Sequence, residues 1–401
     1  KTEDANGDNV AVGYQALKTL NAGANAFNTA IGYTAGTAMT TGIRHVLIGG
    51  LAGKALTSGD KNIAIGYSAL QSDTLGSRSV AIGHDALQAQ NFTTATTAYN
   101  TAVGEAAGLS VTTGVNNTIV GGLAGDAITT GIRHTALGQG ALSAETTGRA
   151  VTAVGFNALA TLNVGSNLES YNVAVGSEAG AAMTVGLRNT IIGGLAGDAL
   201  TDADDNIAIG QGALSTDTLG SKSVAVGRAA LATQNFTTAT DSLNTAVGYV
   251  AGSAVTTGIR NTLIGAESGD AITAGGNNVA VGSGSLTTNT LSSHNVAIGN
   301  GAMFSHNITT ATDAYNIAIG SSAGAAVTTG IFNTITGGLA ADALTTGERN
   351  TVYGKSALTS DTLGSRAVAV GLSALASQNF TTATDNYNVA VGYSAGGLIT
   401  T

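Results

Sequence analysis

Apolar residues recur along this chain in short segments of the form Asn-x-Ala-Val/Ile-Gly. The residue before the glycine is Val, Ile or Leu in 20 of 22 segments, and Ala stands three residues after the glycine in 20 of 22. Successive side chains of an extended strand point to opposite faces, so Thr or Val and then Val or Ile share one face, while Asn, Ala and Gly share the other. Each repeat is therefore predicted to hold a short β-strand with a small-residue face and a larger apolar face.

The segments recur at a fixed period. From Asn28 the units are 17, 17, 17 and 21 residues long, and this 72-residue block opens again at Asn100, Asn172, Asn244, Asn316 and Asn388. A fixed period indicates stacked units, and the pieces between glycines are too short to sustain a helix. We predict an all-β fold: a parallel β-solenoid, or β-roll, of about 22 coils with 17 or 21 residues per coil. Residues 1–401 are predicted to be one repeat domain, truncated at both ends.

Two further positions repeat in most units. Glycine stands ten residues after the first glycine, as in Gly42, Gly59 and Gly76, and we expect a positive φ at that corner. Asparagine stands four residues before the first glycine of most units. Stacking of the units at about 4.8 Å predicts a ladder of side-chain amides that bond up and down the stack. His45 and His134 occupy the same position and are expected to substitute for Asn rather than to bind metal. The predicted ladder includes Asn28, Asn62, Asn100, Asn117, Asn172, Asn244, Asn316 and Asn388.

The 21-residue units carry a four-residue insertion, which is expected to form a protruding loop once per block, with a spacing of about 19 Å. Each insertion offers an apolar or aromatic residue, several hydroxyls and usually a Tyr, a mixture that suits weak, repeated sugar binding. Alternatively, Phe and Tyr fold back over the edge of the coil or fill a gap between subunits. The candidate ligand-binding residues are Phe92, Thr94, Tyr99, Phe236, Thr238, Thr310, Tyr315, Phe380, Thr382 and Tyr387, and a degenerate copy spans 162–172.

Composition and charge argue against several classes of function. The formal net charge is −9 without a basic run, which argues against nucleic acid as a partner, and no apolar stretch is long enough for a membrane helix. Without Cys there is no thiol chemistry. Asp126, Asp198, Asp270 and Asp342 form a recurring column that is expected to be a solvated edge, and no calcium-binding nonapeptide accompanies it. We expect no metal, no cofactor and no catalytic residues.

The predicted coil is thin. One Val or Ile, two or three Ala and an occasional Leu per unit bury little surface against the cost of ordering about 17 residues. Neighbouring coils help, and a second apolar face pressed against partner chains would help more. A parallel homotrimer is therefore predicted.

Several phrases resemble known repeats. NTAIGYTAG at 28–36, NIAIGYSAL at 62–70 and SVAIGHDAL at 79–87 resemble the head repeats of trimeric autotransporter adhesins. NVAVGYQAL at 9–17, TTG at 40–42 and NTIVG at 117–121 also resemble the repeat arrays of phage tail fibres that often end in a self-cleaving chaperone. The resemblance covers essentially the whole chain and implies a trimeric parallel β-roll outside the cell. The autotransporter unit is typically shorter, which favours the tail-fibre type.

The expected function is thus an extracellular structural shaft or head that attaches to a cell surface, on a virion tail or a bacterial surface, with a cell-surface glycan or receptor as partner. One alternative is an ice-binding solenoid, since Thr-Thr-Gly recurs at Thr40, Thr112, Thr129, Thr256, Thr328 and Thr345. Another is a polysaccharide-degrading tailspike, which would require paired carboxylates in a groove.

Overall fold

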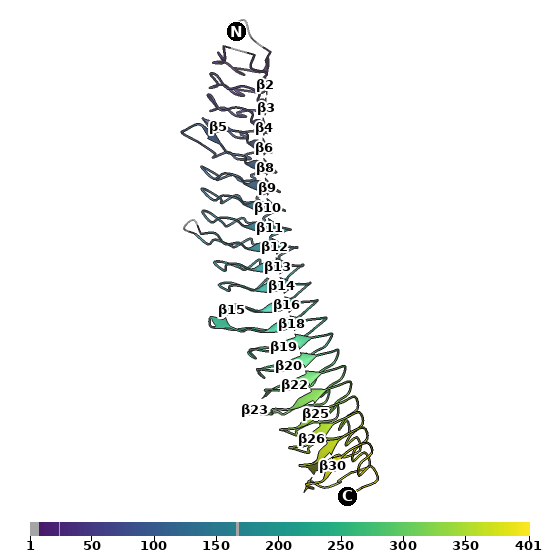
Figure 1. Cartoon of the computed structure of the whole chain (residues 1–401). Coiled ribbons are helices and arrows are strands. Elements are labelled where there is room, and N and C mark those ends of the chain that lie inside the picture. The colour runs from purple at the N-terminus through teal and green to yellow at the C-terminus, as the bar shows by residue number, and fades with distance from the viewer. Residues whose placement is uncertain (1–7, 24, 166–167) are drawn as a thin grey trace. The chain divides into compact units, whose positions relative to one another are not determined.

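A computed structural model describes residues 8–23, 25–165 and 168–401, and in these ranges the chain is all-β, with no helix. The chain divides into two compact units between Asp204 and Asp205, and each unit is a parallel β-solenoid. Together they hold about 22 turns, as the period predicted. Figure 1 shows the turns as successive loops stacked through their short main strands.

The first unit stacks its main strands in sequence order, each parallel to the next. They are β1 (Val10–Val12), β2 (Thr29–Ile31), β3 (Val46–Ile48), β4 (Ile63–Ile65), β6 (Val80–Ile82), β8 (Thr101–Val103), β9 (Thr118–Val120), β10 (Thr135–Leu137), β11 (Thr152–Val154), β12 (Val173–Val175) and β13 (Thr190–Ile192). A short side pair, β5 (Gly76–Ser77) with β7 (Thr96–Thr97), lies at the first long loop.

The second unit repeats this arrangement. Its main strands are β14 (Ile207–Ile209), β16 (Val224–Val226), β18 (Thr245–Val247), β19 (Thr262–Ile264), β20 (Val279–Val281), β22 (Val296–Ile298), β24 (Ile317–Ile319), β25 (Thr334–Thr336), β26 (Thr351–Tyr353), β28 (Val368–Val370) and β30 (Val389–Val391). Its side pairs are β15 (Gly220–Ser221) with β17 (Thr240–Asp241), β21 (Ser292–Ser293) with β23 (Thr312–Asp313), and β27 (Gly364–Ser365) with β29 (Thr384–Asp385).

Equivalent residues lie directly above one another. Ala136 pairs with Ala153, for example, and Leu137 with Val154. We number each turn from the glycine that ends its main strand, such as Gly49. The residues after it form successive turns: Lys54 N–H donates to Leu51 O at 3.1 Å, and Leu56 N–H donates to Gly53 O at 3.2 Å. The rejection of helix for this segment is therefore correct.

Six positions point inward in the 17-residue turns: −4, −2, +3, +4, +7 and +10. The middle residue of each main strand after β1, at −2, is buried and is flanked by two residues of greater exposure. This places the Val/Ile column at −1 on the outside of the coil. The expectation that the Val/Ile column at −1 contributes to the interior is therefore wrong, because the pleat turns −4 and −2 inward together.

The interior keeps its volume by exchanging large and small residues between +4 and +7. Where +4 is Gly, as at Gly53, +7 is a large apolar residue, here Leu56. A Cβ added at Gly53 would lie 2.8 Å from side-chain atoms of both Leu47 and Leu56. Where +4 is Leu, as at Leu70, +7 is usually polar, as in the buried Asp73. The 72-residue period is therefore a cycle of four interior layers rather than of loop length alone.

The corner glycine at +10 has a different role from the one predicted. None of Gly42, Gly59 and Gly76 has a positive φ. A Cβ at Gly59 would instead lie 2.1 Å from Gly76 O in the next turn. Glycine is needed here because two backbones approach closely. The strand glycines do have a positive φ, such as +147° at Gly248.

Candidate interaction surface and the loops beside it

The outward face of the main strands is a regular feature of the surface in both units. Two columns point away from the coil there: Thr, Val or Ile at −3, and mostly Val or Ile at −1. Ile31 in the first unit is 38% exposed, and Ile264 in the second unit is 39% exposed. Each unit stacks eleven main strands at a spacing of about 4.8 Å, and the face is two side chains wide. Its area is therefore roughly 500 Å2 in each unit. Apolar patches of that size mark interaction sites on many proteins.

A column of bulky residues borders this face at −5, directly before the ladder position. These residues adopt positive φ, for example 61° at Arg44 and 50° at Tyr99. A non-glycine side chain in this conformation is strained, so contacts must hold it in place. The four tyrosines at the ends of the long segments belong to this column and are exposed: Tyr99, Tyr171, Tyr315 and Tyr387.

The side chains of this column stack on one another along the axis. Tyr315 lies 4.9 Å from His294 and 6.1 Å from Phe332, measured between ring centroids. The Arg349 guanidinium covers the Phe332 ring at 5.3 Å. Arg78 lies over Tyr99 and Arg366 over Tyr387, both at 5.5 Å. Side chains of neighbouring turns therefore cover ring faces of Tyr99, Tyr315 and Tyr387, which were candidates for sugar binding, so these three tyrosines have a structural role.

A second aromatic column borders the face at +1. Tyr14 and Tyr33 stack with their centroids 5.4 Å apart, and Tyr67 stacks on His84 at 5.5 Å. Arg228 lies over Tyr249 at 5.7 Å. The apolar columns at −3 and −1 therefore lie between two columns that are rich in aromatic and cationic side chains.

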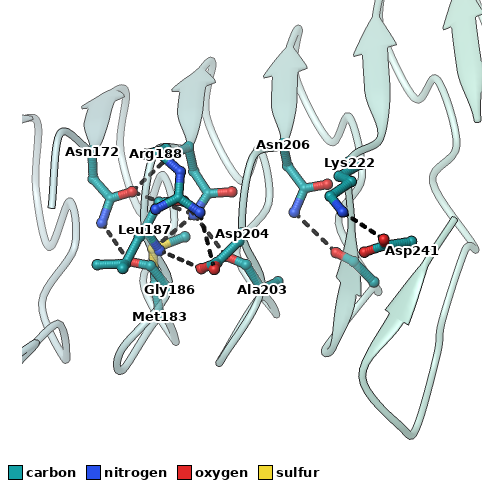
Figure 2. Close-up of polar contacts among 12 residues, drawn as sticks. Asn172, Met183, Gly186, Leu187, Arg188, Ala203, Asp204, Asn206, Lys222 and Asp241 are labelled. Carbon is teal, nitrogen blue, oxygen red and sulfur yellow. Dashed lines mark hydrogen bonds and ion pairs between the residues drawn. The ribbon is translucent and has the colours of Figure 1, made fainter. Parts of the chain in front are cut away.

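The predicted ladder residues lie inside the coil, but their bonds follow a different direction. Asn172 Nδ2 donates across its own turn to Gly186 O, and its Oδ1 accepts the backbone N–H of Asn189 one turn later at 2.8 Å (Figure 2). Asn206 likewise donates to Gly220 O at 2.9 Å. Amide-to-amide bonds occur at a few levels, as between Asn189 and Asn172 at 3.3 Å. The ladder side chains therefore make most of their hydrogen bonds with the backbone and not with one another.

All the predicted ladder residues share one column. Asn28, Asn62, Asn100, Asn117, Asn172, Asn244 and Asn316 are at most 1% exposed, and Asn388 is half-buried. Each joins the corner carbonyl of its turn, except Asn388, whose amide donates to Gln378 Oε1 at 2.8 Å.

Both ladder histidines contact the corner carbonyl as Asn does, but only His45 also accepts a backbone N–H of the next turn, because Nδ1 of His134 has no partner. His45 Nε2 lies 2.6 Å from Gly59 O, and Nδ1 accepts the Asn62 N–H at 3.2 Å. His134 Nε2 lies 2.9 Å from Gly148 O. Burial lowers the pKa of His45, and it lowers the pKa of His134 to about 4. Both rings are neutral structural groups at neutral pH.

The long loops turn their large apolar residues inward. Phe92 is 5% exposed and Phe236 is 7% exposed, and Phe380 is half-buried. The Phe236 ring covers Gly220, where an added Cβ would lie 2.8 Å from a ring carbon. The loop tips hold the remaining candidates, and Thr94, Thr238, Thr310 and Thr382 are all exposed. The Phe residues thus cover the coil edge, as the alternative interpretation expected, and the Thr residues reach solvent. In the degenerate copy, residues 166 and 167 lie outside the described ranges.

A buried carboxylate anchors each of three long loops to the coil interior. Asp217, at +7 of the turn before the loop, is fully buried and accepts the Gly220 N–H at 3.0 Å and the Phe236 N–H at 3.1 Å. Its second oxygen accepts the Gln234 amide at 2.6 Å, and Gln234 in turn bonds Ser223 and Asn244. Asp73 with Gln90 and Asp361 with Gln378 repeat the arrangement. Burial raises the pKa of Asp73.

The other two long segments vary this anchor. Glu145 is fully buried and needs no Gln, because its longer side chain accepts the N–H groups of Gly148 at 2.7 Å and Val164 at 3.2 Å. Asn289 and His306 replace the Asp and Gln in the fourth loop, joined through the Ser292 hydroxyl at 2.6 Å and 3.0 Å. Burial lowers the pKa of His306 to about 4.

Sequence reasoning missed these anchors, although a signal was present. Polar residues at +7 follow Leu or Met at +4, and they fall only in the turn before a long segment or in that turn itself. Aligning the units on +7 would have shown an acid followed one turn later by Gln.

The aspartate column is not the freely solvated edge that was expected. Asp126, Asp198 and Asp270 are half-buried, burial raises the pKa of each, and Oδ1 of each is buried without a hydrogen-bond partner. Asp342 Oδ1 accepts the Thr359 hydroxyl at 2.5 Å.

Comparison with protein-family models and with curated proteins finds no match for this chain. Among the described residues, no helix has the length and apolar character to cross a bilayer. Within the same ranges, His, Asp and Glu side chains form no group of three that could hold a metal ion.

Proposed function

We propose that this chain is a segment of an extracellular structural fibre that attaches to a cell surface, of the phage tail-fibre or adhesin type. We propose further that it assembles as a parallel homotrimer through the outward face of its strands. The observation that carries the proposal is this face, where Ile31, Ile192, Ile264 and Ile319 are each more than a third exposed although the interior of the coil is filled.

The periodicity of the face favours another copy of the same chain as its partner. Side chains repeat along the face with the rise of the solenoid, about 4.8 Å. Only a surface with the same rise stays matched over many turns, and a parallel copy has it. The trimeric number rests on the resemblance to trimeric adhesin and tail-fibre repeats.

Mass photometry of the full chain tests the assembly. We expect particles of three times 39.0 kDa, and we expect Ile264→Asp to reduce them because it places a charge within the apolar face. Thr257→Asp is the matched control, since Thr257 is exposed at a corner away from the strand face. A wild-type chain that stays at 39.0 kDa at micromolar concentration would refute the trimer.

The sequence that flanks this segment in its gene tests the fibre class. A self-cleaving chaperone supports a tail fibre and a membrane anchor supports an adhesin. A flanking domain with an intracellular metabolic activity would contradict both.

One observation favours ice binding as a second candidate. Thr101, Thr118, Thr135 and Thr152 occupy the outward −3 position in four consecutive turns, which makes a regular row of hydroxyl and methyl groups. The Thr-Thr-Gly threonines do not form such a row, because hydroxyls such as that of Thr112 are bonded to the next turn, here Thr129 O at 3.2 Å. Thermal hysteresis lost in Thr118→Asp would support this candidate, and its absence from the wild-type chain would exclude it.

A further inference from the structure

The second unit has a shallow hollow of about 350 Å3 on the part of the coil where positions +5 and +6 point outward. Its lining includes Gly301, Phe304, Ser305, Ser322, Ala325 and Asp342. Its volume is at the low end of small-molecule sites, about 300–1,000 Å3. These positions are separate from the outward strand face, so the hollow does not depend on the proposed trimer.

The hollow coincides with departures from the repeat. Phe304 is 47% exposed, whereas the equivalent residues in the other blocks are Gln88, Ala160, Ala232 and Ala376. Gly301 stands at +2 of the Phe304 turn, where the other blocks carry Asp85, Asn157, Ala229 and Ser373. Ser322 stands at +2 of the next turn, where two other blocks carry the larger Glu178 and Val250. An aromatic ring is thus added in the block where the +2 position of the same turn is Gly. In a chain this regular, such a local break in pattern is a reason to look for function.

The geometry places an apolar wall and a polar wall on either side of a small-residue floor. The Phe304 ring extends over Gly284, where an added Cβ would lie 3.8 Å from two ring carbons. Asp342 stands two turns later in the same +5 column, about 10 Å along the axis. Ala325 occupies that column in the turn between them. Asp342 Oδ1 accepts the Thr359 hydroxyl at 2.5 Å, a bond that holds the carboxylate in place.

We propose that this hollow binds one neutral hexopyranose unit of a glycan. The C–H groups of a pyranose pack against the electron-rich face of an aromatic ring, here Phe304. Its hydroxyls donate to a carboxylate and exchange hydrogen bonds with serine hydroxyls, which Asp342, Ser305 and Ser322 supply. The width of about two turns leaves room for a single ring.

Saturation-transfer difference NMR on the full chain tests this site with free D-glucose, D-galactose, D-mannose and N-acetyl-D-glucosamine. We expect at least one sugar to bind with a Kd of about 1 mM, as suits a small open site. Phe304→Ala should weaken that sugar at least tenfold, and Asp342→Asn should weaken it severalfold. Phe304→Ala creates the residue that three other blocks carry at this position, so the coil should tolerate it.

Phe332→Ala is the matched control, because Phe332 is another exposed aromatic of the same unit but lies in the −5 column. It should leave sugar binding unchanged. The proposal is overturned if none of the four sugars receives saturation, or if Phe304→Ala binds as the wild-type chain does. Mass photometry of the same samples reports the trimer independently, so the two proposals can fail separately.

Discussion

Turns with an apolar residue at +7, called plain turns here, and turns beside the long loops fill the coil interior with different side chains. In a plain turn of the second unit, Gly252 at +4 leaves space that Val255 at +7 fills. In the turn before a loop, Leu214 takes that space and the buried Asp217 points to the backbone. The apolar layer stabilises by burial alone. The polar layer provides acceptors where the chain leaves the coil and its N–H groups lose the partners of the next turn.

The difference explains why the loops have a fixed base and an exposed tip. Thr240 Oγ1 donates to Thr238 O at 2.9 Å, and Thr237 and Thr238 are exposed. At the base, Asp217 accepts the Phe236 N–H inside the coil. A solenoid can therefore extend a loop without opening its interior, provided that a buried acceptor stands one turn earlier.

Removing the acceptor should have the largest effect. Asp217→Ala leaves the Gly220 N–H, the Phe236 N–H and the Gln234 amide without this partner, each at about 1–3 kcal/mol, so we expect a loss of about 5 kcal/mol in unfolding free energy. Urea unfolding followed by circular dichroism measures it. Asp241→Ala is the control, because this exposed aspartate contacts Lys222 at the surface. Equal losses in the two variants would contradict the anchor.

Acid should weaken the anchor that contains histidine. The pKa of His306 falls from 6.5 to about 4 on folding, so protonation favours the unfolded form. The contribution of His306 is complete above pH 6.5 and is lost as pH falls towards 4, with an upper limit of about 3 kcal/mol. Hydrogen exchange, corrected for intrinsic rates, should show the 307–314 loop opening in this range before the 235–242 loop. His306→Gln should abolish that difference, and a difference that persists would refute the assignment.

Placing a polar residue in a plain layer should cost less than removing an anchor. Val255→Gln buries an amide where the neighbouring layers supply no carboxylate at +7, and we expect a loss of about 2 kcal/mol. The same urea measurement detects it. Val255→Ile, which keeps the layer apolar, is the control. A Gln variant as stable as the Ile variant would show that interior polarity is not restricted to the loop layers.

The smallest effect is expected at the surface of the loop base. Lys222 Nζ lies 2.5 Å from Asp241 Oδ2, with both side chains about half exposed (Figure 2). Lys222→Ala should cost less than about 1 kcal/mol, because water screens the pair. The loss should shrink further in high salt. A loss comparable to that of Asp217→Ala would show that this surface ion pair holds the loop base as strongly as the buried Asp217 does.

The repeat period in the sequence predicted how the turns stack. It did not predict which side chains point into the coil and which point outward. The stacking of Ala136 on Ala153 follows from the 17-residue spacing, and the all-β solenoid follows with it. Alternation along the strand does not say which face is inside, so the Val/Ile column was assigned to the interior. Gly59 could be identified as a required glycine, but its close approach to Gly76 O depends on two turns at once.

The candidate loop residues show the same limit. Their recurrence predicted their height along the coil, and the exposed Thr238 is where the pattern placed it. Burial of Phe236 depends on Asp217, which stands 19 residues earlier and is visible only when the turns are aligned. Stacking of Tyr315 between His294 and Phe332 depends on a backbone with positive φ that composition does not indicate.

The most direct test of the buried anchor is the exchange rate of one amide. NMR hydrogen exchange of the Phe236 N–H, measured in the native chain at neutral pH, reports whether a buried acceptor holds the loop base. We expect this amide to exchange with the slow amides of β16 and β18, and to become fast in Asp217→Ala. A Phe236 amide that exchanges as fast as those of Thr237 and Thr238 in the native chain would contradict the anchor.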